Sequence, residues 1–173
     1  MEIITLKFDD SIRLDNLVVS LGFFDGVHVA HQTLLNQTLE IAKKYNKKSA
    51  MMTFSTHVLS FIQKQEFKHL TNLDEKAKMA SKMGFDYLLV FEVTDELVNL
   101  EPEVFISRFL SCAHTVVVGF DFTFGKRGKG NVDLLKSFTT FQTIVLDEMT
   151  YASEKIGSTR IREALSLGNI ELA

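Results

Sequence analysis

The stretch LVVSLGFFDGVHVAHQTLL, residues 17–35, decides the fold of this chain. Its first part, residues 17–22, is a continuous and β-branched apolar run, which is typical of a strand covered on both faces. From residue 28 to residue 45 the apolar side chains recur at helical spacing, with polar side chains on the other side. A buried strand that passes directly into a helix predicts one β–α unit of a parallel sheet.

The rest of the sequence repeats this alternation. We expect further strands at 49–54, 86–93, 115–120 and 142–149, and further helices at 71–84, 101–110, 131–138 and 158–168. The first of these helices has visible ends, because Asn72 and Glu75 have capping-box spacing and Gly84 suits a helix end. The pattern predicts an α/β fold with a parallel sheet and helices on both faces. Such sheets bind ligands at the carboxyl ends of their strands, near the point where the strand order reverses.

The composition excludes several classes of protein. The 173 residues suit one domain with its own core, and the net charge of −3 gives no basic field to attract nucleic acid or an anionic membrane. The single cysteine, Cys112, excludes an intramolecular disulfide. The N-terminus lacks the pattern of a signal peptide, and no apolar run approaches the roughly 20 residues that a membrane span needs. We therefore expect a cytoplasmic protein without membrane or nucleic-acid partners.

Gly22, Asp25, Gly26, His28 and His31 lie where the first strand turns into the helix. Glycine lets the backbone approach a ligand or adopt a positive φ, and the start of a helix offers free N–H groups to phosphate. Two imidazoles three residues apart lie on one face of the first turn and could donate to the same phosphate oxygens. An ordinary strand–turn–helix with Asp25 as a cap explains the same residues equally well. A metal pair is disfavoured, because no third ligand is nearby in the sequence.

Three other segments end on the same predicted edge of the sheet. In GSTRIR, residues 157–162, a capping Ser158 or Thr159 and two arginines could hold a polyphosphate, or could form a plain helix start. In GFDFTFGKRGKG, residues 119–130, phenylalanines precede a glycine-rich basic turn. This segment suits a flat ring and a phosphate, or equally a strand end with core phenylalanines. His57 follows a strand in TFSTH, and by itself such a histidine is more often structural.

Taken together and in order, these motifs resemble the adenylyltransferase module of prokaryotic FAD synthetases, the bifunctional riboflavin kinase/FMN adenylyltransferases. GFFDGVHVAHQ is similar to the family's G-x-F-D-G-V-H-x-G-H-Q, TFSTHV to T-F-x-P-H-P, and IGSTRIREAL to I-S-S-T-x-x-R. VGFDFTFGKRGKG resembles the flavin-side signature, and the resemblance runs from about residue 15 to the end. It implies a Rossmann-like nucleotidyltransferase fold. It also implies transfer of AMP from ATP to the phosphate of FMN, giving FAD and pyrophosphate, with Mg²⁺.

The resemblance implies a role for each matching residue. The ATP site would comprise Gly22, Phe24, Asp25, Gly26, His28, His31, Ser158, Thr159 and Arg162. His28 and His31 would stabilise the phosphates during transfer, and Arg162 would act with them as the third catalytic residue, at the leaving pyrophosphate. The flavin side would comprise His57, Asp121, Phe124 and Gly125. Mg²⁺ would enter with the substrate phosphates, and Asp121 could contact it.

Five positions depart from the family pattern. Phe23 replaces an asparagine, Ala30 a glycine, Thr56 and Val58 two prolines, and Gly157 a serine. These changes keep two alternatives to an FMN adenylyltransferase open. One is a related nucleotidyltransferase with another phosphate substrate, and the other is a non-catalytic flavin- or nucleotide-binding module. The flavin-side segment argues against the first alternative.

The resemblance also bears on domain organisation. In the family this module is followed by a riboflavin kinase β-barrel, whereas this sequence ends at GNIELA. We therefore expect residues 1–173 to be a single FMN adenylyltransferase domain without riboflavin kinase activity.

Overall fold

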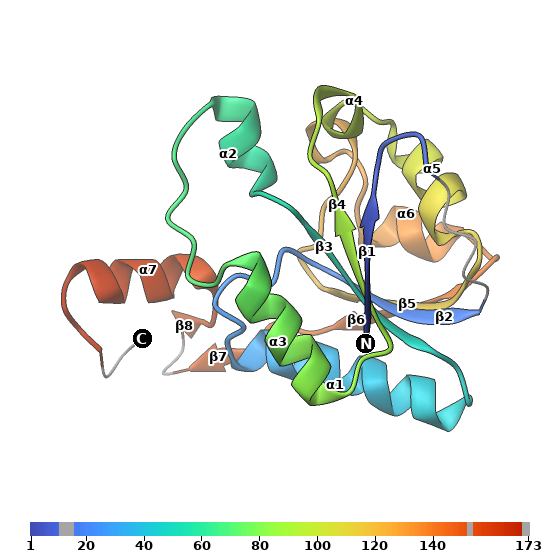
Figure 1. Ribbon diagram of the computed structural model, residues 1–173, viewed down its shortest axis with the longest axis horizontal. Helices are drawn as coiled ribbons and strands as arrows, with labels where there is room; N and C mark the ends of the chain where they lie inside the picture. The colour runs from blue at the N-terminus through green and yellow to red at the C-terminus, as the bar shows by residue number, and fades with distance from the viewer. Residues whose placement is uncertain (11–15, 152–153, 171–173) are drawn as a thin grey trace.

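A six-stranded parallel sheet forms the centre of the computed structural model, which describes residues 1–10, 16–151 and 154–170 (Figure 1). The strands lie in the order β1-β4-β3-β2-β5-β6, and each neighbouring pair is parallel. They are β1 (Glu2–Leu6), β2 (Leu17–Leu21), β3 (Ser49–Phe54), β4 (Tyr87–Phe91), β5 (Ala113–Gly119) and β6 (Gln142–Leu146). The predicted α/β class with a parallel sheet is confirmed.

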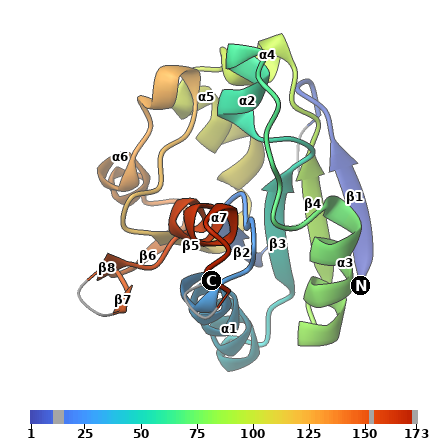
Figure 2. The same cartoon turned by 90° about the vertical axis from the view of Figure 1, so that its left-hand side faces the viewer.

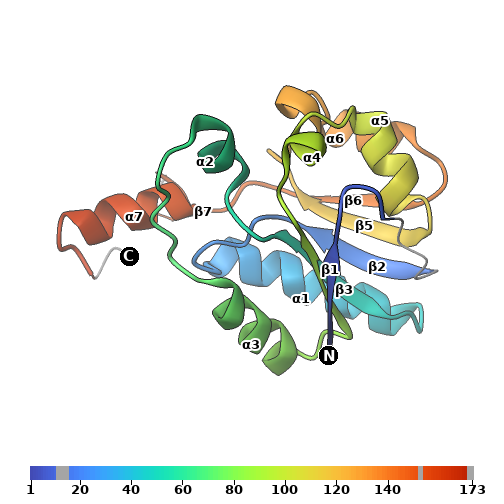
Figure 3. The ribbon, with the colours of Figure 1, turned by 45° about the horizontal axis from the view of Figure 1, so that its top comes forward.

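Helices cover both faces of this sheet, as the alternation of strands and helices predicted (Figures 1 and 3). One face carries α1 (Val29–Lys44) and α3 (Leu73–Met83). The other face carries α4 (Asp95–Val98), α5 (Pro102–Phe105), the π-helical turn η1 (Ile106–Leu110) and α6 (Val132–Ser137).

The central strands contribute to two separate cores, because successive side chains of a strand point to opposite faces of the sheet. Val18 and Val117 belong to the core with α1 and α3, whereas Val19 and Val118 belong to the core with η1 and α6. All four side chains are almost fully buried. This double burial explains why the strands read as continuous apolar runs in the sequence.

Two helices stand outside these layers. They are α2 (Val58–Gln63), which follows β3, and α7 (Ser158–Ser166), which follows a small antiparallel hairpin of β7 (Thr150–Tyr151) and β8 (Glu154–Lys155). Figure 2 looks onto the side of the molecule that carries both helices, with α2 above α7. Both follow the carboxyl ends of strands, so they border the edge of the sheet where ligands bind in this class of fold.

The strand order reverses beside β2. From β2 the chain continues to β3 on one side, while β5 pairs with β2 on the other side. The carboxyl ends of β2 and β5 therefore flank the topological switch point. The segments that follow them, residues 22–28 and 120–131, contain two of the motifs found in the sequence.

The boundaries of several elements differ from the predictions. The strand expected at 142–149 ends at Leu146, and the helix expected at 101–110 is α-helical to Phe105 and π-helical after it. The predicted elements did not include β1, α2, α4, β7 (Thr150–Tyr151) or β8 (Glu154–Lys155). The helices α2 and α4 and the hairpin strands are too short to show a clear period, whereas β1 is a largely exposed edge strand without the continuous apolar run of the central strands. The capping box of Asn72 and Glu75 is confirmed, and Gly84 ends α3 with a φ of 94°.

Candidate functional site

A cleft of about 1000 Å³ opens at the carboxyl edge of the sheet. It is lined by the segments that follow β2, β3, β5 and β6 and by the start of α7. The predicted convergence of four motif segments on one edge is therefore confirmed. The predicted site residues that line the cleft are Gly22, Phe24, His28, His31, His57, Asp121, Phe124, Gly125, Ser158 and Thr159. Asp25, Gly26 and Arg162 are not among its lining residues.

The turn between β2 and α1 has a backbone that few sequences can adopt. Phe24, Gly26 and Val27 have φ values of 54°, 73° and 37°. The φ of Gly26 favours glycine, and a Cβ atom there would lie 2.7 Å from the terminal Cδ1 of Leu70, which would have to shift. A positive φ at phenylalanine and β-branched valine is strained, and such strain concentrates at functional sites.

Asp25 joins three segments of the chain behind this turn. Its carboxylate is 2% exposed and accepts hydrogen bonds from the backbone N–H groups of Leu70 and Thr71, at 2.8 and 3.1 Å. Its second oxygen accepts a hydrogen bond of 2.6 Å from the guanidinium of Arg162 on α7. The interpretation of Asp25 as a helix cap is wrong, because His28 occupies the N-cap position of α1. Asp25 instead holds α7 against the β2–α1 turn.

His28 and His31 lie together at the start of α1. Their rings stack with centroids 3.7 Å apart, and Nδ1 of His28 accepts from the backbone N–H of His31 at 3.4 Å. Both side chains line the cleft, and Nδ1 of His31 is buried without a hydrogen-bond partner among the described residues. The predicted placement of the two imidazoles on one face of the first turn is therefore confirmed.

Both imidazoles are held in their neutral form. Burial lowers the pKa of His28, and burial together with the neighbouring His28 and Lys76 lowers the pKa of His31 to about 3. A neutral imidazole still donates one N–H to an oxygen of a ligand. The start of α1 adds free backbone N–H groups and the positive end of the helix dipole. The site therefore favours an anion by hydrogen bonds and dipoles, without imidazolium charge.

The start of α7 forms a second place for an anion on the cleft. Its N-cap residue is Gly157, and no described side chain caps it. The predicted capping role of Ser158 or Thr159 is wrong, because the Ser158 hydroxyl donates to the backbone carbonyl of Asp25 at 2.7 Å. The first N–H groups of α7 are consequently left for a ligand or for water.

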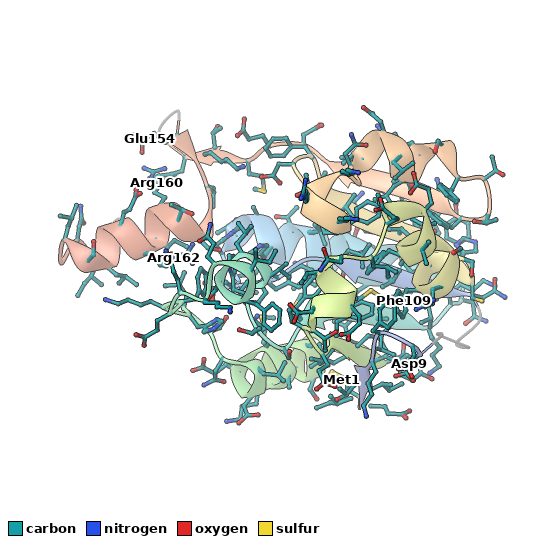
Figure 4. All side chains as sticks on the ribbon, turned by 90° about the horizontal axis from the view of Figure 1, so that it is seen from above. Met1, Asp9, Phe109, Glu154, Arg160 and Arg162 are labelled. Atoms are coloured by element: carbon teal, nitrogen blue, oxygen red, sulfur yellow. The ribbon has the colours of Figure 1, made fainter. Side chains whose placement is uncertain are left out.

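The two arginines of α7 have different surroundings (Figure 4). Arg160 lines the cleft and forms an ion pair of 2.7 Å with Glu154 of β8. Arg162 pairs with Asp25, donates to the Thr159 hydroxyl at 3.3 Å, and lies 4.7 Å from the ring centroid of Phe67. Arg162 thus fixes the position of α7.

An aromatic cluster connects the β2–α1 turn to the segment around α2. His57 caps α2 through its Nδ1 and stacks on Phe67 with ring centroids 3.9 Å apart. The Phe23 ring packs edge-on against His57 at 5.0 Å and lies 5.7 Å from His69. Burial lowers the pKa of His57, and the charge of Arg162 lowers it further. Phe23, one of the departures from the family pattern, is therefore accommodated by packing within this cluster.

The segment after β5 combines core residues with residues that face the cleft. Phe124 is buried against Phe105, and its backbone pairs with that of Gly130. Gly125 has a φ of 69° and would place a Cβ 2.9 Å from the backbone of Pro102, so only glycine fits there. Asp121 is exposed and forms an ion pair with Lys155 of β8.

The described residues contain no group of three or more His, Cys, Asp or Glu side chains placed to hold a metal ion. Asp121, Asp147 and Glu163 are the carboxylates that line the cleft. Mg²⁺ characteristically keeps several waters and binds through one or two carboxylates together with substrate phosphates. The cleft therefore fits a magnesium ion carried by a phosphate ligand. It does not contain a preformed cage of protein ligands among the described residues.

The residues that support the turn from behind, Thr71 and Lys76, belong to none of the motifs predicted from the sequence. Thr71 accepts a hydrogen bond from the N–H of Gly26 at 3.0 Å, and Lys76 donates to the carbonyl of Phe23 at 2.6 Å. Lys76 lies one turn from Leu73 and Ala80 on the buried face of α3. A cation on the apolar face of an otherwise amphipathic helix was the available signal.

The fold and the cleft together define a class of protein. A parallel α/β sheet with two helix starts bordering one cleft at the switch point is a Rossmann-like α/β fold, which binds nucleotides at this edge of the sheet. The family model described as FAD synthetase matches residues 11–160, and the chain belongs to this family.

Individual relatives agree with this membership. A bifunctional riboflavin kinase/FMN adenylyltransferase of Listeria monocytogenes is 40% identical over 91% of this chain and 52% of its own length. An FAD synthetase of the same organism is 33% identical over 90% of this chain and 66% of its own length. A solved structure described as a macrolide-efflux protein from Streptococcus pneumoniae superposes with a TM-score of 0.82 at 28% identity. It covers 97% of this chain and 57% of that one. The chain spans about half the length of three curated bifunctional relatives that it matches, from Listeria monocytogenes, Buchnera aphidicola and Bacillus subtilis.

Within residues 1–10, 16–151 and 154–170, no helix has both the length and the apolar character needed to cross a membrane.

Proposed function

We propose that this chain is an FMN adenylyltransferase, which transfers AMP from ATP to the phosphate of FMN and releases pyrophosphate. The observation that carries the proposal is the convergence of four motif segments on one cleft. The starts of α1 and α7 and the segment after β5 all line it. Its volume of about 1000 Å³ is at the upper end of the range for small-molecule sites, as two substrates side by side require.

The β2–α1 turn and the start of α7 would bind ATP. Neutral His28 and His31 would donate N–H groups to the phosphate oxygens, next to the backbone N–H groups of the first turn of α1. Ser158 and Thr159 at the start of α7 would face the β- and γ-phosphates. Arg162 would act on these phosphates through its hold on α7, because its guanidinium is engaged by Asp25.

For the transfer of AMP to the FMN phosphate, the protein would have to position the two substrates and stabilise the developing negative charge. An oxygen of the FMN phosphate forms a bond to the α-phosphorus of ATP, and the bond from that phosphorus to the bridging oxygen breaks, so that pyrophosphate leaves with the electron pair. The nucleophile is already an anion, so no strong general base is needed. N–H donors fixed before the reaction are suited to stabilising the charge that develops on the α-phosphate and on pyrophosphate.

The side of the cleft near α2 would receive FMN. Leu59 and Ile62 of α2 are exposed apolar residues that line the cleft, and Phe120 after β5 lines it as well. These side chains provide apolar surface for a flat ring system, together with His57 and Phe122. Asp121 and Gly125 would lie between the two substrates.

We include Mg²⁺ in the proposal as an ion that enters with ATP. It supplies, when bound, neutralisation of the phosphate charge, and Asp121, Asp147 and Glu163 are the cleft carboxylates that could contact it. We further propose that residues 1–173 act as a single adenylyltransferase unit in the cytoplasm. The continuous sheet and the single cysteine support this proposal.

The deciding experiment incubates the purified chain with ATP, FMN and Mg²⁺ and follows FAD by chromatography. We expect FAD and pyrophosphate in equal amounts, with no FAD when FMN is replaced by riboflavin. Folded protein that forms no FAD at micromolar concentration would contradict the proposal. Calorimetric binding of ATP or FMN without product would then favour a non-catalytic binding module. Product from another phosphate in a substrate panel would favour a related nucleotidyltransferase.

A further inference from the structure

Lys76 is a buried cation that none of the four cleft motifs contains. It lies on α3 and is 2% exposed, whereas Lys78 on the same helix is exposed. Lysine is rarely buried to this extent, because removing its charge from water is costly. The cost of burying this ammonium group must be offset by the contacts that Lys76 makes.

The ammonium group of Lys76 is aimed at the β2–α1 turn. Its Nζ donates to the backbone carbonyl of Phe23 at 2.6 Å, and it lies 3.8 Å from the centroid of the Phe23 ring. The same carbonyl also accepts from the hydroxyl of Thr53 at 3.0 Å. The peptide group before Phe24, whose φ is positive, is thereby fixed by two donors.

The charge of Lys76 acts on two histidines that line the cleft, His31 and His57. Burial lowers the pKa of Lys76 to about 8, and the nearby charge of Asp25 opposes this effect. Lys76 in turn contributes to the lowered pKa values of His31 on α1 and His57 at the start of α2. Asp25 is already paired with Arg162. Lys76 and Arg162 both face the carboxylate of Asp25, so these three side chains together carry a net positive charge.

We propose that Lys76 is a positioning residue of the phosphate subsite, holding the Gly22–Gly26 turn and adding a fixed positive charge behind His28 and His31. The inference rests on the proposed function, in that it takes the anion in this part of the cleft to be ATP. Because both imidazoles are neutral, they bring no net charge to the subsite. A buried cation is screened by salt far less than an exposed one, so it favours a polyphosphate even without touching it.

The test compares Lys76→Met with Lys76→Arg and with the matched exposed control Lys78→Met. Binding of ATP is measured by calorimetry, and FAD formation is measured in parallel. We expect Lys76→Met to fold with a melting temperature somewhat below that of the parent, because the Phe23 carbonyl loses the donor Lys76 but keeps the Thr53 hydroxyl. It should lose about tenfold to a hundredfold in ATP affinity and in kcat/KM for ATP. Lys76→Arg should restore part of the loss, and Lys78→Met should match the parent.

The pH dependence separates a role for the charge from a role in packing alone. For the parent, ATP affinity should fall above about pH 8, as Lys76 loses its proton, whereas the affinity of Lys76→Met should stay flat from about pH 7 to about pH 10. Equal ATP affinities and equal pH dependences for Lys76→Met and the parent would overturn the proposal. Weaker ATP binding by Lys76→Met supports the role of Lys76 even if the parent forms no FAD. The absence of FAD would contradict only the proposed adenylyltransferase activity.

Discussion

Replacing Asp25 by asparagine is expected to destabilise the fold and to loosen α7 from the β2–α1 turn. The carboxylate accepts two backbone hydrogen bonds, from Leu70 and Thr71, and pairs with Arg162 at 2.6 Å. Asparagine keeps the shape and one acceptor oxygen. It removes the charge, however, and its NH₂ group cannot accept from the guanidinium.

The magnitude follows from these contacts. A hydrogen bond to a charged group contributes about 1.5–3 kcal/mol and a neutral one about 0.5–1.5 kcal/mol, so the two backbone bonds together lose about 2 kcal/mol. Breaking a fully buried ion pair costs about 3–5 kcal/mol. The Arg162 side chain is 26% exposed and regains water, so we discount this loss to about 1 kcal/mol. The total of about 3 kcal/mol is less than the stability of a typical domain, so the variant should still fold.

Urea unfolding followed by circular dichroism measures this change as a lower midpoint at an unchanged m value. The matched control is Glu40→Gln, which neutralises an exposed carboxylate on α1 and should change the unfolding free energy by less than about 0.5 kcal/mol. Asp25→Asn should also bind ATP more weakly in calorimetry, since α7 is no longer tied to the turn. An unfolding free energy equal to that of the control would refute the reasoning.

Three other predictions concern the β2–α1 turn and α1. His28→Ala should slow FAD formation, measured by chromatography, by about two to three orders of magnitude, because a fixed donor to the developing charge is lost; an unchanged rate would remove His28 from the mechanism. The folded-state pKa of His31 is about 3, below its ordinary value of 6.5, so the unfolded state takes up the proton first and stability is lost as the pH falls from about 6.5 towards 3. In His31→Gln the urea midpoint should depend less on pH over this range than in the parent. The same pH dependence in both proteins would contradict a neutral, buried His31. Gly26→Ala should cost about 1–3 kcal/mol, because φ is +73° and the new Cβ would lie 2.7 Å from Leu70. Gly157→Ala meets nothing within 4 Å, and the less favourable N-cap of α7 is offset by a stiffer unfolded chain, so its unfolding free energy should change by less than about 1 kcal/mol.

The β–α unit at residues 17–44 shows what local sequence could predict. The change of period from a continuous apolar run to helical spacing gave both elements to within a residue or two. The helix α2 was not predicted because six residues show no clear period, and β1 was not predicted because this edge strand is largely exposed and lacks the continuous apolar run of the central strands. The cap of α7 was assigned wrongly for a different reason. Ser158 is a good capping residue in isolation, but its hydroxyl is occupied by the carbonyl of Asp25, 133 positions earlier.

The sequence by itself determined the α/β class, the convergence of the motifs on one edge of the sheet, and the family resemblance. These follow from periodicity and from short motifs, which are local properties of the chain. Only the tertiary structure decided which motif residues face the cleft. Asp25 and Arg162 lie 137 positions apart and engage each other behind it, and Lys76 supports Phe23 from 53 positions away. Such partners are brought together by the packing of α3 and α7 against one turn, and no local pattern specifies a contact between segments so far apart.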